Sequence, residues 1–86
     1  MSFGRIELVC VQVARIVRAE REKRGYSMTD LARRAGLSRA MISFVEHELR
    51  NPSLETLLRI AHALDMDLAE IIRQADRAAS RQAKSS

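Results

Sequence analysis

The chain has 86 residues, enough for one small domain with a single core, and 47% of them are apolar. One proline and three glycines are too few for the tight turns of a strand-rich fold, so we expect an all-helical domain with an aliphatic core. The formal net charge of +4 favours polyanionic partners.

The first predicted helix runs from about residue 5 to residue 24. Its apolar residues recur at helical spacing on one face: Ile6, Val9, Cys10, Val13, Ile16 and Val17. Gly25 supplies the stop, because glycine readily takes the left-handed conformation that ends helices. Cys10 lies in an apolar run, which favours packing in the core or at an interface over redox chemistry. A partner chain is a candidate to cover the first two turns.

Two short helices joined by a glycine turn are predicted next, within residues 27–47. Ser27 can cap the second helix, which Gly36 closes after two turns. Ser38 can cap the third, which ends near His47. A recognition helix must project from the domain to enter the major groove of DNA, while the helix before it crosses the phosphate backbone. We therefore interpret residues 27–47 as a helix-turn-helix that binds double-stranded DNA.

Two further helices and a tail complete the predicted domain. A loop containing the single proline separates the third helix from a fourth, which Ser53 can cap. Asp67 begins a fifth helix. The residues after Ala79 are small and polar, so residues 80–86 are expected to form a flexible tail, and residues 1–79 a single domain.

Residues 13 to about 68 resemble the lambda-repressor-like, Xre-type helix-turn-helix domain. The matching positions are Arg21, Gly25, Ser27, Leu31, Ala32, Gly36, Ser38, Arg39, Ile42, Ser43, Glu46, residues 50–54, Leu57, Leu58, Ile60, Ala61, Ala63 and Leu64. The resemblance implies a five-helix all-α domain, usually dimeric on pseudo-palindromic operators, that regulates transcription at the nucleoid in the bacterial cytoplasm. The short chain and its loop at residues 50–53 are similar to stand-alone regulators, including controller proteins of restriction-modification systems.

The resemblance also implies roles for individual side chains. The start of the third helix faces base edges in the family, and the base-reading residues would be Ser38, Arg39, Ala40, Ser43 and Phe44. Arg39 is the strongest candidate, because its guanidinium can bond guanine O6 and N7 together. The other DNA-facing positions would be Met28, Thr29, His47, Arg50 and Asn51. Of these, Thr29, Arg50 and Asn51 would hold phosphates, together with the amides at the start of the second helix. Met28 departs from the family's usual glutamine, which contacts phosphate.

Two internal contacts are expected as well. The resemblance implies an ion pair between Arg21 and Glu46 that ties the first helix to the third. Surplus apolar residues predict a homodimer whose interface contains Met66, Leu68, Ile71 and Ile72. Such a dimer would set two recognition helices about 34 Å apart. Two cations and two anions balance between residues 38 and 53, so we expect few phosphate contacts there and an affinity that depends on dimerisation or on cooperative binding of several dimers.

The alternatives are weaker on the residues present. A protein-binding module without DNA reading would use Phe44, Met28 and Met41 as an apolar docking patch. An enzyme is not expected, because His47 and His62 lack a third ligand at metal-site spacing, and no glycine-rich phosphate loop or nucleophile elbow is present. We expect no metal, cofactor or small-molecule ligand, and no segment reaches the roughly 18 apolar residues of a membrane span.

Overall fold

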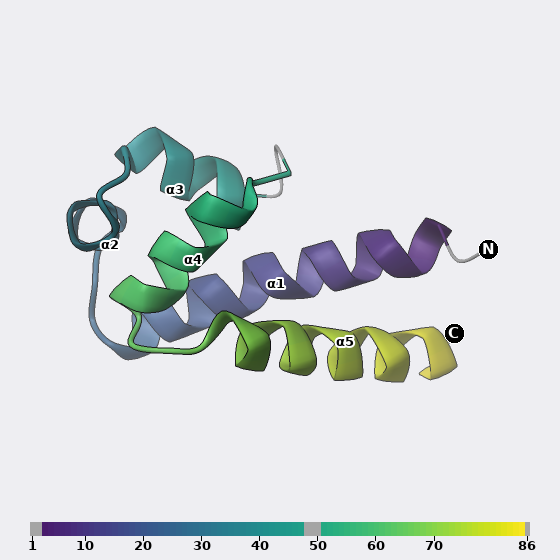
Figure 1. Ribbon diagram of the computed structural model, residues 1–86. Helices are drawn as coiled ribbons and strands as arrows, with labels where there is room; N and C mark the ends of the chain where they lie inside the picture. Colours follow the sequence, from purple (N-terminus) through teal and green to yellow (C-terminus); the bar gives the residue numbers. More distant parts are fainter. Residues whose placement is uncertain (1–2, 48–50, 86) are drawn as a thin grey trace.

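The computed structural model describes residues 3–47 and 51–85, and within them it contains five helices and no strand (Figure 1). The helices are α1 (Phe3–Lys23), α2 (Met28–Ala35), α3 (Arg39–Glu46), α4 (Leu54–Ala63) and α5 (Leu68–Ser85). The expected five-helix, all-α class is confirmed.

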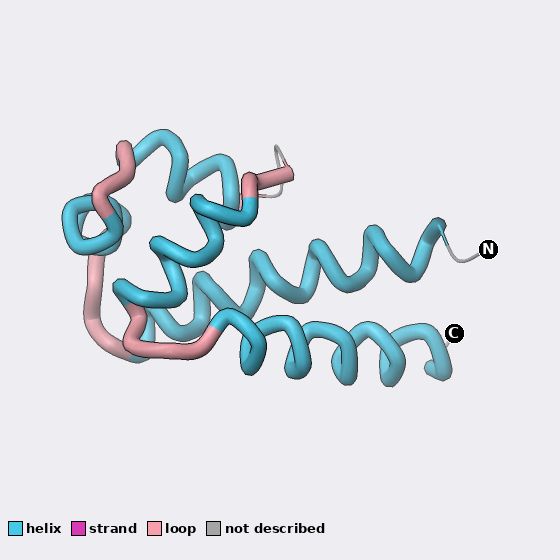
Figure 2. The backbone as a smooth tube through the Cα atoms, in the orientation of Figure 1, coloured by secondary structure: helices cyan, strands magenta, loops and turns pink. Residues whose placement is uncertain are grey.

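The helices divide into a cluster and a projection (Figure 1). Helices α2, α3 and α4 gather around the C-terminal half of α1, joined by short loops that Figure 2 shows in pink. Helices α1 and α5 lie side by side and run in opposite directions, so that both ends of the chain project from the same side. We call the projecting part, residues 3–16 of α1 and 72–85 of α5, the two-helix arm.

Serine caps set the starts of the three helices in the cluster, as the sequence predicted. The hydroxyl of Ser27 accepts the amide of Asp30 at 3.0 Å, and the Asp30 carboxylate accepts the amide of Ser27 at 2.9 Å, a reciprocal capping box. Ser38 and Ser53 cap α3 and α4 through their hydroxyls, each of which accepts the backbone amide three residues later. Gly36 ends α2 with a φ of 69°, where an L side chain would be strained.

The core lies where all five helices meet and is aliphatic throughout. Its largest fully buried side chains are Leu31, Ile42, Ile60, Leu64, Ile71 and Val17. Burying a side chain of this size contributes about 1.5–3 kcal/mol, so these residues are the main stabilising term of the cluster. Met28 and Met41 are partly buried and pack against the same core.

The expected flexible tail after residue 79 is wrong, because α5 continues to Ser85. Ala79 is fully buried, and Ser80 accepts a hydrogen bond of 2.8 Å from Arg5. Further along, Gln82 accepts one of 3.0 Å from Gln12. The last turns of α5 therefore pack on the first turns of α1, a neighbour from the other end of the chain.

Candidate nucleic-acid interface

Helices α2 and α3 form the expected helix-turn-helix, with residues 36–38 as the turn. Ile42 and Val45 on the inner side of α3 are buried in the core. The amide of Leu37 donates to the carbonyl of Ala32 at 2.9 Å, which closes the end of α2. The opposite side of α3 is thereby fixed as an outward surface.

The start of α3 is the most exposed part of this surface. Ser38, Arg39 and Ala40 are all exposed. Within the described part of the chain, the Arg39 guanidinium has no ion-pair partner, so its donors are available to a ligand. Ser43 and Phe44, one turn later, are half-buried and offer less surface.

The end of α3 carries a hydrogen-bonded histidine. His47 is exposed and caps the helix. Its Nδ1 donates to the carbonyl of Ser43 at 2.9 Å and lies 3.3 Å from the Ser43 hydroxyl. These contacts fix the imidazole ring on the outward side of α3, four residues from Ser43.

The start of α2 differs from the phosphate site that the sequence predicted. Met28 turns partly into the core, and the amide of Asp30 is already bonded to Ser27. The backbone amide and then the hydroxyl of Ser27 lower the pKa of the Asp30 carboxyl, so a negative charge stands at this helix end. Thr29 remains exposed. The amide of Asp30 is therefore not available to hold a phosphate, and the nearby carboxylate repels one.

The last two expected phosphate contacts belong to the loop between α3 and α4. Asn51 is exposed in that loop. Arg50 lies outside the described residues.

The ion pair between Arg21 and Glu46 is present and bidentate. Arg21 Nε lies 2.7 Å from Glu46 Oε2, and Nη2 lies 3.0 Å from Oε1. Arg21 Nη1 also donates to the carbonyl of Tyr26 at 2.8 Å. The Glu46 side chain is fully buried, and its hydrogen bond raises the pKa of Arg21 above its ordinary value. One guanidinium thus joins α1, α3 and the loop before α2.

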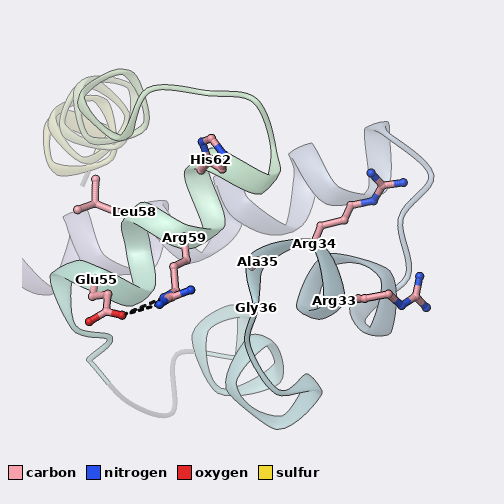
Figure 3. Close-up of a pocket in the computed structure, with 8 residues that line it drawn as sticks. All are labelled: Arg33, Arg34, Ala35, Gly36, Glu55, Leu58, Arg59 and His62. Carbon is pink, nitrogen blue, oxygen red and sulfur yellow. Dashed lines mark hydrogen bonds and ion pairs between the residues drawn. The ribbon is translucent and has the colours of Figure 1, made fainter.

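Sequence reasoning missed three arginines that flank the turn. Arg33 and Arg34 point outward from α2, and Arg59 of α4 bonds Glu55 at 2.9 Å (Figure 3). Arg34 also stacks on the Tyr26 ring, 4.2 Å from its centroid. The charge balance over residues 38–53 did not include Arg33 and Arg34, which lie just before Gly36, and only the fold brings Arg59 of α4 beside them.

The exposed charge of the helix-turn-helix is consequently positive. Glu46 is buried against Arg21, so it does not act on the surface. Among the described residues 27–47, three exposed arginines (Arg33, Arg34 and Arg39) then stand against Asp30. A polyanion therefore meets a more favourable surface than the sequence count indicated.

The expected dimer face is partly wrong. Ile71 is 1% exposed and belongs to the core, so it offers no surface to a partner. Met66 and Leu68 are half-buried and pack against the core, whereas Ile72 is 40% exposed. Leu54 (67%) and Leu58 (50%), which the sequence analysis did not single out, are more exposed. Figure 3 shows Leu58 pointing from α4 towards α5. We call Leu54, Leu58 and Ile72 the apolar stripe.

No group of three or more His, Cys, Asp or Glu side chains in residues 3–47 and 51–85 is placed to hold a metal ion. None of the helices in that part is long and apolar enough to span a membrane.

Known proteins are similar to this chain in sequence and in fold. A model of the Helix-turn-helix family matches residues 17–71. The HTH-type transcriptional regulator SinR of Bacillus licheniformis is 30% identical over 61 residues, which are 70% of this chain and 55% of SinR. This chain spans about half the length of the curated relatives it matches.

Two solved structures are similar over the same region. The restriction-modification controller protein C.AhdI from Aeromonas hydrophila superposes with a TM-score of 0.69 at 35% identity, over 72% of this chain and 94% of that one. SinR in complex with DNA superposes with a TM-score of 0.66 at 28% identity, over 70% of this chain and 97% of that one.

Proposed function

Because this chain belongs to the Xre-like helix-turn-helix family of transcriptional regulators, we propose that it binds an operator in double-stranded DNA sequence-specifically, as a small homodimeric regulator of the controller or repressor type. The observation that carries the proposal is the start of α3, where Arg39 is exposed and unpartnered among the described residues. We propose that it acts in the bacterial cytoplasm, at the nucleoid, where its operators lie.

Arg39 is the principal base-reading residue of this proposal. Its two parallel donors suit guanine O6 and N7, a contact worth roughly 1–3 kcal/mol of discrimination against other bases. Ser38 and Ala40 flank it on the exposed start of α3, where the alanine methyl can contact a thymine methyl. Ser43 and Phe44 are half-buried, so we assign them the edge of the reading surface.

Phosphate contacts come from the flanks in this proposal. Thr29 and Arg33 are four residues apart on α2, so they share one helix face, and both are exposed. Asn51 and Arg50 extend the contacts to the loop after α3, and His47 lies between the loop and the reading surface. Arg33 and Arg34 supply the charge that residues 38–53 lack.

A homodimer fits a pseudo-palindromic operator. The apolar stripe on α4 and α5 gives each copy a surface to bury, with Met66 and Leu68 at its edge. The chain measures 37 × 22 × 18 Å, so two copies side by side can set their α3 helices about 34 Å apart, one turn of DNA. Each subunit then reads one half-site.

The test is the selection of bound sites from random duplexes with the native chain and with Arg39→Ala. We expect the native chain to select a two-fold related sequence, and the variant to lose preference at one base position in each half-site, by roughly 5- to 100-fold. Arg15→Ala, which removes an exposed arginine from α1, should keep the native preference. An unchanged preference in Arg39→Ala contradicts the assigned reading residue.

Salt dependence separates DNA reading from an apolar docking module. Affinity for the selected site should fall steeply between about 50 and 200 mM salt, because phosphate contacts release counterions. Binding that is insensitive to salt and to sequence contradicts the proposal.

A further inference from the structure

The two-helix arm lies outside the family match at residues 17–71, and it forms a groove against the matched domain. The groove has a volume of about 570 Å³. Its walls are the first half of α1, the loop after α3, α4 and the start of the arm in α5; the lining residues used below are Ile6, Glu7, Cys10, Pro52, Leu57 and Ile72.

The chemistry of the groove is apolar. Glu7 is the one charged residue among the described residues that line it, in a chain of which 30% is charged. A polyanion finds no cation there, and a small polar ligand finds few groups to orient it. Ile6 is nonetheless 60% exposed and Cys10 is exposed. The groove therefore fits an apolar protein surface.

We propose that the occupant is the arm of a second copy of this chain, inserted reciprocally, so that each subunit's first α1 turns fill the groove of the other. The inference deepens the proposed homodimer and rests on it. It assigns the arm a specific task, the extension of the dimer interface beyond α4 and α5.

Continuity of the surface identifies the second copy as the occupant. Ile72 belongs both to the apolar stripe and to the groove wall, so the two surfaces meet at this residue. A copy seated on the stripe therefore lies over the mouth of the groove. The two surfaces are one interface, and covering only the stripe would leave Ile6 and Cys10 in water.

The shape of the chain also favours a second copy as the occupant of the groove. A two-fold interface is self-complementary, so a projection on each copy can fill a hollow on the other. The arm is a projection that ends in exposed Ile6, and the groove beside it is the hollow. Because both come from this chain, a two-fold axis can satisfy both at once.

Cys10 provides the test, because it is the single cysteine and lines the groove. The full-length chain is labelled with a thiol-reactive maleimide over a dilution series, while light scattering follows its oligomeric state. In the dimer we expect Cys10 to react at least tenfold more slowly than in the dilute monomer. Labelling of a dimer at the rate of the monomer overturns the inference but leaves the homodimer standing.

A pair of variants supplies the second readout. Ile6→Glu places a charge in the interface, whereas Ala19→Glu adds the same charge to an exposed position of α1 outside the groove. We expect Ile6→Glu to raise the dimer dissociation constant at least tenfold and to make Cys10 reactive, with Ala19→Glu unchanged. Equal dimerisation of the two variants overturns the inference. A chain that stays monomeric at high micromolar concentration but selects DNA sites overturns the dimer and leaves the DNA reading intact.

Discussion

The helix-turn-helix cluster and the two-helix arm are held together by different means. The cluster buries large aliphatic side chains, such as Leu31 and Ile42, and a fully buried glutamate paired with Arg21. The arm buries smaller side chains (Val13, Ala14, Ala75 and Ala79), and its rim contact between Arg5 and Asp76 at 2.8 Å is exposed. An alanine buries less apolar area than a leucine, so the arm contributes less stability for each residue ordered.

This difference shows that the cluster fixes the orientation of its helices, whereas the arm leaves apolar surface exposed. The cluster must hold α3 at a fixed angle to DNA, and a bidentate ion pair joins α3 to α1 for that purpose. The arm keeps Ile6 exposed at its end. Its stability is expected to depend more on association than that of the cluster does.

The largest effect is expected from breaking the buried pair. Glu46→Ala should lower the free energy of unfolding by about 3–5 kcal/mol, because it leaves the Arg21 guanidinium buried without its carboxylate. Chemical denaturation followed by circular dichroism measures the loss. The matched control is Glu55→Ala, which removes the exposed partner of Arg59 and should change stability by less than about 1 kcal/mol. Equal losses would show that burial does not distinguish the two pairs.

A smaller effect is expected from overfilling the arm. Ala79→Leu should cost about 1–3 kcal/mol, because Ala79 is fully buried and the added atoms must push α1 and α5 apart. Thermal unfolding measures it, with Ala19→Leu at an exposed position of α1 as the control. If Ala79→Leu left both stability and Cys10 labelling unchanged, the close approach of the two helices in the arm would be contradicted.

The smallest effect concerns the pH dependence of the capping box. The pKa of Asp30 is lowered, mainly by the Ser27 amide, so its carboxylate stabilises the folded chain above its unfolded pKa of about 3.9. That stabilisation is lost as the pH falls through the folded pKa. Asp30→Asn should therefore be less stable than the native chain near pH 6, and the difference should shrink in acid.

Glu70 gives the matching measurement on α5. Its pKa is also lowered, but mainly by the Gln74 side chain and then by Arg73. Glu70→Gln should show the same trend without altering hydrogen exchange in α2. Faster exchange in α2 is expected only in Asp30→Asn, and its absence there would contradict the role of the capping box.

Local signals predicted the cluster well. Ser27, Ser38 and Ser53 cap the helices that the sequence assigned to them, and Gly36 takes the left-handed conformation expected at the turn. These signals are local because each depends on hydrogen bonds between residues three or four apart. The fold class followed from them together with the helical spacing of apolar residues.

The incorrect or missing predictions concern burial and contacts that depend on residues far apart in the sequence. The residues after 79 look like a tail because alanine and serine bury little surface on their own, yet Ser80 and Gln82 of α5 bond to Arg5 and Gln12 of α1. Ile71 and Ile72 are adjacent and equally apolar, so composition could not show that the first is in the core and the second is exposed. The place of Arg59 beside Gly36 was missed for a similar reason, since Arg59 comes from α4, far from Gly36 in the sequence.

The unbroken length of α1 has a consequence for regulation. The same helix carries Ile6 in the arm and Arg21, which forms the buried ion pair with Glu46 of α3. A dimer that fixes the arm restricts the angles that α3 can sample, and DNA that fixes α3 restricts the arm in turn. The two equilibria are then linked, so operator DNA must tighten dimerisation by the same factor that dimerisation tightens operator binding. Occupancy would rise steeply over a narrow range of protein concentration, as a threshold.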